Sequence, residues 1–459
     1  MRLINALMAG LLLAGSGPVA AATAKHAAGK PAKALPARAA APARPVALPD
    51  TPEVAALRQG FRFGFPIYEF MRTRNNQLAR AGAIGLPNAV NMLFPRAVLA
   101  DATSREVTTP NNDTLYASGW LDLAGGPVLL TVPALGGRYN SAALMSVQTD
   151  NTAILGTRTG GQGGRYAIVG PGYAGPTPAG TELIRSASND AWLLVRVLVA
   201  GPGDLAAAAA ALGGFKLEAA GSDTAVAAFK SATPAVPDAA AFRAVVDEAI
   251  ARNPGLAARA AAFTGLAPGA EWARHLPGLR AELKGGLALA GDVVGGWSYP
   301  RAGIGDFGDD NDLRAYVALG GLAALPRVEA MYLSARADKD GTVLDGSRAY
   351  RVTLPPRLPV GAFWSLTMYQ VEPDGRLFFV ANPLNRFAVG DRSKQLRSNR
   401  DGSYEIFVQA GAPHGERVVN WLPAPKGKFV LVFRAYLPRA ELLDGSFRLP
   451  PVVAAEVVP

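Results

Sequence analysis

The stretch Pro110-Asn-Asn-Asp-Thr-Leu-Tyr116, followed by Trp120-Leu-Asp-Leu and Gly125-Gly-Pro-Val-Leu-Leu-Thr-Val-Pro133, decides the fold class. Asn and Asp side chains hydrogen-bond their own backbone, so the front of the stretch predicts a turn. Residues 128–132 form a short β-branched run between Gly-Pro and Pro, which is typical of a buried strand. Polar side chains at the end of a strand are where a β scaffold presents a site, although an Asx turn alone explains the same residues.

On either side of this stretch, groups of strands and groups of helices follow one another along the chain. Helical spacing of apolar residues predicts a helix over residues 50–80, and turn signals separate short strands between 107 and 199. Helices are predicted again at 205–212 (with Asp204 as its N-cap), 238–252 and 312–325. Beyond 330 the strand pattern returns, with residues 429–436 as an apolar strand buried on both faces. We therefore expect a mainly β protein with a helical insert, of the α+β class.

The first 49 residues differ in composition from the rest. Arg2, an apolar core and Ala22-Thr-Ala24 predict a signal peptide over residues 1–24, and hence a periplasmic or secreted protein. Whether that segment is cleaved or kept as an anchor stays open. Residues 25–49 are rich in Ala and Pro, carry five basic residues and no acid, and predict a disordered linker. This basic linker is a solvated spacer or a contact for anionic envelope polymers.

Charge and cysteine content exclude several classes of function. Six of the 46 Lys and Arg residues precede Asp50, so the rest of the chain carries 40 against 36 carboxylates, a net charge of +4. No basic run interleaved with aromatic residues is present, so we expect no nucleic-acid partner. The chain has no cysteine and therefore no disulfide or cysteine-bound metal. We expect no metal and no cofactor, and the oligomeric state stays open, a homo-oligomer included.

Known catalytic motifs are missing. The sequence contains no Gly-x-Ser-x-Gly, Ser-x-x-Lys, His-Glu-x-x-His or Walker loop. One Gly-x-Gly-x-x-Gly occurs over residues 303–308, but no apolar strand precedes it and four Asp residues crowd the predicted helix start that follows. Carboxylates there repel phosphate, so we interpret this segment as a glycine loop before an acidic helix start rather than as a dinucleotide site.

Several stretches resemble a bacterial two-domain family, domain of unknown function 1254 joined to domain of unknown function 1214. In the first half, besides the opening stretch, they are Phe63-Gly-Phe-Pro-Ile-Tyr-Glu69, Gly137-Arg-Tyr139, Gly156-Thr-Arg-Thr-Gly-Gly161 and Val169-Gly-Pro-Gly-Tyr173. In the second half they are Phe363-Trp-Ser-Leu-Thr-Met-Tyr369, Asn382-Pro-Leu-Asn-Arg386, Asp401-Gly-Ser403, Asn420-Trp-Leu-Pro-Ala-Pro425 and Leu443-Asp-Gly445. Neither label states an activity, so the resemblance implies a fold and a domain order but no reaction.

The resemblance implies two β-rich domains joined by a helical segment, the C-terminal one a jelly-roll-like β-sandwich. The N-terminal β-rich domain is expected over residues 50–200, the helical connecting segment over 201–329 and the C-terminal domain over 330–459. This chain departs from the family in one respect. Many members carry a His a few positions after the residue matching Asn91, whereas here the run is Asn91-Met-Leu-Phe-Pro95. A mechanism that used that His as a base does not transfer to this chain.

The polar residues in the matching stretches are the candidate site. Glu69 and Asp113 are predicted to be catalytic carboxylates, because a carboxylate pair at suitable separation hydrolyses glycosidic bonds, with Arg158 as an electrostatic clamp. The predicted ligand-binding residues are Asn111, Tyr116, Arg138, Trp364, Asn382, Arg386, Asn420 and Trp421, and Arg196 is a further candidate. Arg suits carboxylates and Asn suits sugar hydroxyls, but each residue alone is also explained by a turn or a core.

Three functions remain from these residues. The first is an exported hydrolase acting on a glycan or an ester. The second is a periplasmic binding protein for a carbohydrate or small organic acid, with Arg and Trp in its pocket. The third is a structural or assembly protein, in which the domain interface is the reason for the matching stretches.

Overall fold

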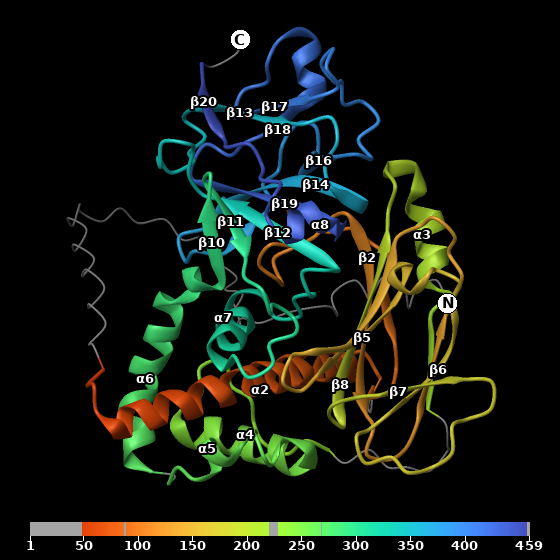
Figure 1. The fold of residues 1–459 in the computed structure, drawn as a ribbon, viewed down its shortest axis with the longest axis vertical. Helices are drawn as coiled ribbons and strands as arrows, with labels where there is room; N and C mark the ends of the chain where they lie inside the picture. The colour runs from red at the N-terminus through yellow and green to blue at the C-terminus, as the bar shows by residue number, and fades with distance from the viewer. Residues whose placement is uncertain (1–47, 87–88, 220–227, 268, 457–459) are drawn as a thin grey trace, which may run out of the picture.

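The computed structural model describes residues 48–86, 89–219, 228–267 and 269–456. The predicted signal peptide 1–24 and nearly all of the linker 25–49 lie outside the described residues. Within the described ranges, no helix combines the length and the apolar composition that crossing a membrane requires. A helical layer, a pair of β-sheets and a β-sandwich make up the molecule (Figure 1). The predicted α+β class, with two β-rich domains, is confirmed.

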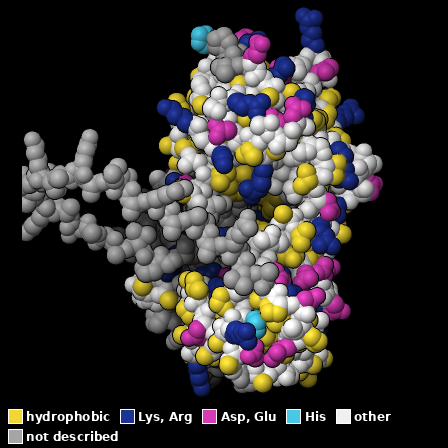
Figure 2. All heavy atoms as spheres, turned by 90° about the vertical axis from the view of Figure 1, so that its left-hand side faces the viewer, with side chains coloured by type: hydrophobic (Ala, Val, Ile, Leu, Met, Phe, Trp, Pro, Cys, Tyr) yellow, Lys and Arg dark blue, Asp and Glu magenta, His cyan; other side chains and the backbone are white. Residues whose placement is uncertain are grey.

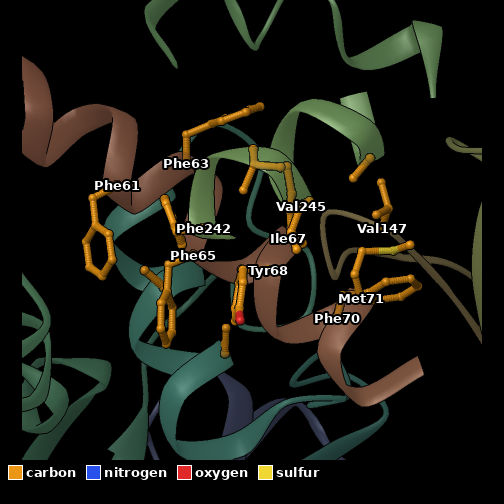
Figure 3. Close-up of a cluster of buried hydrophobic side chains, with 14 of the residues drawn as sticks. Phe61, Phe63, Phe65, Ile67, Tyr68, Phe70, Met71, Val147, Phe242 and Val245 are labelled. Carbon is orange, nitrogen blue, oxygen red and sulfur yellow. The ribbon is translucent and has the colours of Figure 1, made fainter. Parts of the chain in front are cut away.

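The helical layer is built around α2 (Pro52–Ala83), which Thr51 caps and Pro52 starts. Four helices pack against α2, namely α4 (Ala239–Arg252), α5 (Ala261–Thr264), α6 (Ala270–Gly285) and α7 (Asn311–Gly321). Figure 3 shows aromatic side chains of α2 meeting Phe242 of α4, whose ring lies 5.5 Å from those of both Phe61 and Tyr68. The helices predicted near residue 50 and in the connecting segment therefore share one core.

The first β unit consists of two sheets. One has the strand order β1 (Phe94–Arg96), β2 (Thr114–Asp122), β8 (Asp190–Leu198), β4 (Asn140–Ser146), β5 (Asn151–Gly156). The other has the order β7 (Glu182–Arg185), β6 (Gly164–Val169), β3 (Val128–Val132), β9 (Lys216–Ala219). Their facing side chains form one apolar core, which α3 (Leu205–Leu212) also covers. The apolar strand predicted at residues 128–132 is thus central to this core.

The last residue of β5 is a glycine whose backbone conformation and close neighbours restrict substitution. Gly156 has φ +112°, and a Cβ atom there would lie 2.4 Å from Oδ1 of Asn140. We expect Gly156→Ala to lower the free energy of unfolding by about 2 to 4 kcal/mol through clash and backbone strain. Gly160→Ala is the control, since its φ is +89° but nothing lies within 4 Å of the added Cβ, and it should cost about 1 kcal/mol. Urea unfolding measures both, and equal losses would contradict the clash.

The C-terminal unit is a two-sheet β-sandwich. Its larger sheet has the order β10 (Gly291–Val294), β11 (Trp297–Pro300), β12 (Ala330–Ala335), β19 (Phe429–Pro438), β14 (Val360–Val371), β15 (Leu377–Phe378), with β16 (Ala388–Gly390) also on β14. The smaller sheet has the order β18 (Trp421–Pro423), β17 (Tyr404–Gln409), β13 (Ala349–Leu354), β20 (Val453–Ala455). The short α8 (Ala440–Leu443) follows β19, and an apolar core fills the space between the sheets.

Short 3-10 turns complete the chain, at η2 (Thr157–Thr159), η3 (Pro202–Asp204), η4 (Pro254–Leu256), η5 (Leu287–Ala290) and η6 (Gly415–Asn420). The helix predicted at residues 205–212 is present with Asp204 at its N-cap position, but the Asp204 side chain accepts no cap hydrogen bond from it. The Asp204 carboxylate instead binds Arg138, with Nη2 2.7 Å from Oδ1. A bidentate guanidinium is a stronger partner for a carboxylate than one backbone N–H, which is why the cap is lost.

The glycine loop over residues 303–308 is held by the turn between β4 and β5. The carbonyl oxygen of Gly305 accepts from both Asn151 N and Asn151 Nδ2 at 2.9 Å, and Phe307 N donates to Asp150 Oδ1 at 2.8 Å. Helix α7 then begins with Asp310 as its N-cap, and it ends at Gly321, earlier than the predicted residue 325. The loop backbone therefore binds other parts of the protein.

The surface carries both signs of charge. Figure 2 shows Lys and Arg side chains interspersed with Asp and Glu and with scattered hydrophobic side chains on the face it draws. Clusters of paired charges are instead found inside the molecule, between its layers.

Candidate functional site

The larger sheet of the sandwich has two different faces. Odd-numbered residues of β19 from 429 to 435 enter the sandwich core, so Arg434 and Tyr436 lie on the opposite face by the two-residue period of a strand. Tyr332 of β12 is paired directly with Arg434 and shares that face. The face is turned towards the first β unit, because the ring of Tyr436 packs 5.1 Å from that of Tyr139. A polar, aromatic surface thus meets the first domain.

The first β unit presents a matching face. Leu115 and Ala117 of β2 enter its own core, which leaves Tyr116 on the other side. Arg196 of β8 is directly opposite Tyr116, and its guanidinium carbon lies 5.5 Å from the Tyr116 ring centroid. We call the polar residues between these two faces the interdomain cluster. Its members are Asn111, Asp113, Tyr116, Tyr139, Arg158, Arg196, Glu329, Tyr332, Ser365, Tyr369, Arg392, Arg434 and Tyr436.

Asp113 ties the two domains together. Its carboxylate accepts from Arg392 Nη2 at 2.6 Å and from Ser365 Oγ at 2.7 Å, and both partners belong to the C-terminal domain. Burial alone would raise the pKa of Asp113, but the charges of Arg392 and Arg434 and the hydrogen bonds outweigh it. The pKa therefore lies below its usual value, and Asp113 is an anion at neutral pH. Asp113 therefore forms a charged link between the two domains.

Glu329 makes a second link across the interface. It is fully buried, accepting from Tyr139 OH at 2.6 Å and from Arg158 Nε at 2.7 Å. Burial and the nearby Glu329 charge raise the pKa of Tyr139 well above its usual value, so this phenol stays neutral. Both partners of Glu329 come from the first domain, and the link mirrors the one at Asp113.

Arg434 is enclosed by hydroxyl and carbonyl groups. Its guanidinium donates to Thr367 Oγ1 at 2.7 Å and to the phenol of Tyr369. Tyr369 OH in turn donates to the carbonyl oxygen of Pro110 at 2.5 Å, at the start of the polar stretch 110–116. Burial raises the pKa of Tyr369 to about 12, although Arg434 lowers it. This arginine is therefore well satisfied by protein groups.

Arg196 differs from the other arginines of the cluster. It is only 5% exposed, and the one hydrogen bond it makes among the described residues is a long one, 3.3 Å from Nη2 to the carbonyl oxygen of Ala323. Its Nε and Nη1 atoms are buried without an acceptor, which leaves three N–H groups unsatisfied. Burial lowers the pKa of Arg196, but the surrounding tyrosine hydroxyls raise it by more, so the side chain stays a cation. No carboxylate within the described ranges pairs with it.

The edge of the cluster reaches solvent close to Arg196. Asn111, Tyr116 and Tyr332 are half-buried, whereas Tyr436 is fully buried behind them. Asn111 Nδ2 donates to Tyr436 OH at 2.7 Å, and the hydroxyls of Tyr332 and Tyr436 lie 3.4 Å apart. The arrangement is a cation on the inside and neutral hydroxyl and amide groups towards the outside. Such a set of donors suits a small anion.

The structure places five of the sequence-predicted residues in the interdomain cluster, namely Asn111, Asp113, Tyr116, Arg158 and Arg196. Glu69 lies elsewhere, in α2, where its carboxylate accepts from Arg72 Nε at 3.0 Å. Arg138 binds Asp204. Glu69 and Asp113 thus belong to separate hydrogen-bond networks, and their proposed partnership in hydrolysis stays a prediction.

The remaining predicted residues hold loops and core of the sandwich. The Trp364 ring stacks on Phe433 at 5.8 Å, and Trp421 Nε1 donates to the carbonyl oxygen of Gln409 at 2.8 Å. The other three residues hold loops through hydrogen bonds to backbone groups. Asn382 Nδ2 donates to the carbonyl oxygen of Arg386 within the same turn, and Arg386 Nη1 donates to the carbonyl oxygen of Trp421 at 2.7 Å. Asn420 Oδ1 accepts from Arg397 N. The contacts of these five residues are those of structural side chains.

Sequence reasoning missed most of the C-terminal half of the cluster. Arg434 and Tyr436 interrupt an otherwise apolar strand at an interval of two, which is the signal that could have indicated a polar face. Glu329, Tyr332 and Arg392 have no comparable local signal. Their role depends on which sheet covers them, and that is a tertiary property.

Two hollows in the surface are lined by no residue of the interdomain cluster. One of about 660 Å³ is lined by Leu123, Ala124, Gly125, Gly126, Gly170, Pro171, Gly172, Tyr173, Ala174, Asn189, Pro254 and Gly255. Residues 170–173 of one matching stretch line it, but none of its lining side chains is charged. A ligand there would have only backbone groups, an amide and one phenol to bind. The described residues also contain no group of three or more His, Asp or Glu placed to hold a metal ion.

Comparison with known families agrees with the two-domain arrangement. The profile of a protein of unknown function, DUF1254, matches residues 90–219, and that of a second protein of unknown function, DUF1214, matches residues 329–440. Together they match more than half of the chain. The chain belongs to the two-domain family formed by these modules. No curated protein matches it.

Two solved structures resemble this chain to different degrees. The VPA0106 protein of Vibrio parahaemolyticus is 21% identical, with a TM-score of 0.68, over 88% of this chain and 100% of that one. A putative uncharacterized protein from Burkholderia cenocepacia is 14% identical, with a TM-score of 0.46, over 89% of this chain and 91% of that one. At this identity the first likeness shows a shared fold alone.

Proposed function

We propose that this family member binds a small anionic ligand, such as an organic acid, between its two β domains, with Arg196 as the anchor. The observation that supports the proposal most strongly is the buried guanidinium whose Nε and Nη1 have no acceptor. A buried charge without a partner is costly, and proteins keep one where a ligand or a function requires it. The half-buried Asn111, Tyr116 and Tyr332 supply the hydrogen bonds that would orient the ligand.

Binding is favoured over hydrolysis by the partners of the two predicted carboxylates. Asp113 is held by Arg392 and Ser365, and Glu69 is held by Arg72, so each already has a protein partner. A general acid needs a raised pKa, whereas the pKa of Asp113 is lowered. An exported hydrolase for glycans or esters stays a prediction with less support than binding.

A purely structural interface is the other alternative. Asp113 and Glu329 do link the domains, and their guanidinium partners have acceptors, as structural ion pairs require. Arg196 does not fit this pattern, because a structural arginine at 5% exposure would be expected to have acceptors for its donors. Export, as predicted from the first 24 residues, would make the ligand a periplasmic or environmental acid.

The test is the substitution Arg196→Met. If the role of Arg196 is to bind a ligand, its substitution removes a destabilising buried charge from the ligand-free protein. The melting temperature of the ligand-free variant should therefore equal or exceed that of the wild type. Thermal-shift measurements with acetate, lactate, succinate, citrate and galacturonate, and with glucose as a neutral control, should show stabilisation of the wild type by at least one anion. The variant should show none.

A matched control is Arg158→Met, in the same cluster. It removes a guanidinium that pairs with the fully buried Glu329, so it should destabilise the protein by about 3 kcal/mol or more. The proposal fails if Arg196→Met destabilises the protein as Arg158→Met does, or if no anion shifts the melting temperature of the wild type.

A further inference from the structure

Arg196 is one member of a row of side chains across the first sheet. The strand registers place Arg96 of β1 opposite Tyr116 of β2, and Tyr116 opposite Arg196 of β8. Directly paired residues point to the same face of a sheet. Two strand spacings separate the two arginines, so their backbones lie about 10 Å apart with the Tyr116 ring between them.

Arg96, like Arg196, has a buried N–H group without a hydrogen-bond acceptor. Its Nε atom is buried without an acceptor, and its only hydrogen bond among the described residues is a 3.4 Å contact from Nη2 to Ser104 Oγ. No ion pair within the described ranges includes Arg96. On the same face, two residues before Tyr116, the Thr114 hydroxyl is also buried without a partner. Unsatisfied polar atoms therefore lie on both sides of Tyr116.

Arginines outnumber carboxylates in this region of the molecule. The cluster together with Arg96 holds five arginines, namely Arg96, Arg158, Arg196, Arg392 and Arg434. The carboxylates that meet them in the described residues are three, namely Asp113, Glu329 and Asp391. Arg158 is paired with Glu329, and Arg392 with Asp113 and Asp391, while Arg434 lies in the field of Asp113. The two positive charges in excess are those of Arg96 and Arg196.

We propose that the ligand is a small dicarboxylate, with one carboxylate on Arg196, the other on Arg96, and its aliphatic spacer across the face of Tyr116. The inference rests on the proposed function, since it names the ligand class of the same site. Two separated guanidinium groups are best matched by two separated carboxylates. A single carboxylate bound between them could not form a bidentate hydrogen-bonded pair with either guanidinium. The ring of Tyr116 offers an apolar face for methylene groups.

Isothermal titration calorimetry on the full chain tests the inference with succinate, glutarate and adipate, each against the monocarboxylate of the same length, and with inorganic phosphate. One dicarboxylate should bind the wild type at least about tenfold more tightly than its matched monocarboxylate, which is the effect of one additional charge-assisted contact. Arg96→Ala should remove that preference, so that the dicarboxylate binds the variant no more tightly than its matched monocarboxylate does. Arg196→Met should abolish binding of both.

Arg105→Ala is the matched control, since Arg105 lies in the segment after β1 but is half exposed and pairs with Glu372 at 2.6 Å. It should leave every affinity unchanged. If monocarboxylates bind as tightly as dicarboxylates and Arg96→Ala changes neither, the dicarboxylate inference is overturned while the proposed function stands. Tighter binding of phosphate than of any dicarboxylate also overturns it. If no anion binds at all, the proposed function fails with it.

Discussion

Replacing Asp113 by alanine is expected to lower the free energy of unfolding by about 3 to 5 kcal/mol. The carboxylate is 3% exposed and is the partner of Arg392 at 2.6 Å, and its charge also acts on the buried Arg434. Without it, two guanidinium groups remain in the interface with less compensating charge, and Ser365 loses its acceptor. Urea unfolding followed by circular dichroism measures the loss.

The same residue gives a pH dependence whose direction follows from its pKa. The folded pKa of Asp113 is below the value of an unfolded chain, so its contribution is complete above about pH 4 and is lost as the pH falls through the folded value. The difference in stability between the wild type and Asp113→Ala should therefore be constant from neutral pH to about pH 5 and shrink below pH 4.

Asp401→Ala is the control for Asp113. Asp401 is exposed and serves only its own turn, accepting from Ser403 N at 2.9 Å. Its loss should cost no more than about 0.5 kcal/mol. An Asp113→Ala variant that is no less stable than Asp401→Ala would show that the interdomain ion pair contributes little.

Replacing Arg252 by methionine is expected to have an effect of similar size at a different interface. Arg252, at the end of α4, lies 2.7 Å from Asp122 Oδ2 and 2.8 Å from Asp190 Oδ2, which join it to β2 and β8. Asp190 is fully buried, and its second nearby cation, Arg74, is 3.8 Å away. The substitution leaves two buried carboxylates undercompensated, so the free energy of unfolding should fall by about 3 to 5 kcal/mol.

The matched control for Arg252 is Arg351→Met, which breaks an exposed pair with Glu405 at 3.0 Å on the surface of the sandwich. An exposed ion pair contributes about 0 to 1 kcal/mol. The denaturant guanidinium chloride is a salt and would screen these charges, so urea is the better denaturant. Equal losses in the two variants would contradict the view that the cluster at Asp190 joins the helical layer to the first sheet.

Much of the fold could be predicted from local patterns. Residues 128–132 have a β-branched run between turn residues, and they form β3 as expected. Residues 238–252 combine helical spacing with Asp238 as N-cap, and the carboxylate of Asp238 does accept from Ala241 N at 2.7 Å. In both cases the deciding interactions lie within a few residues, where sequence spacing specifies geometry.

The partners across layers could not be predicted in the same way. Nothing in the sequence near Asp204 indicates that Arg138, in a turn 66 positions away, would take its carboxylate from the helix start. The same limit applies to α2, whose helical core partners begin only at residue 239.

The candidate site shows this limit most clearly. Asn111, Asp113 and Tyr116 were singled out because polar residues at a strand end are typical of a site, and all three lie in the interdomain cluster. Trp364 and Trp421 are candidates because they lie in the stretches that resemble the family, but they belong to the sandwich core and its edge. Residue type and spacing give the face of a strand, but only the packing of two domains decides which face becomes an interface.

Anion binding at Arg196 is tested most directly by a crystal structure of the protein grown with succinate, refined at a resolution that separates waters from carboxylates. We expect a carboxylate of succinate within about 3 Å of Nε or Nη1 of Arg196, between the tyrosines of the two domains. A guanidinium bridged only by ordered water to backbone carbonyls, or paired with a carboxylate of the protein itself, would contradict it.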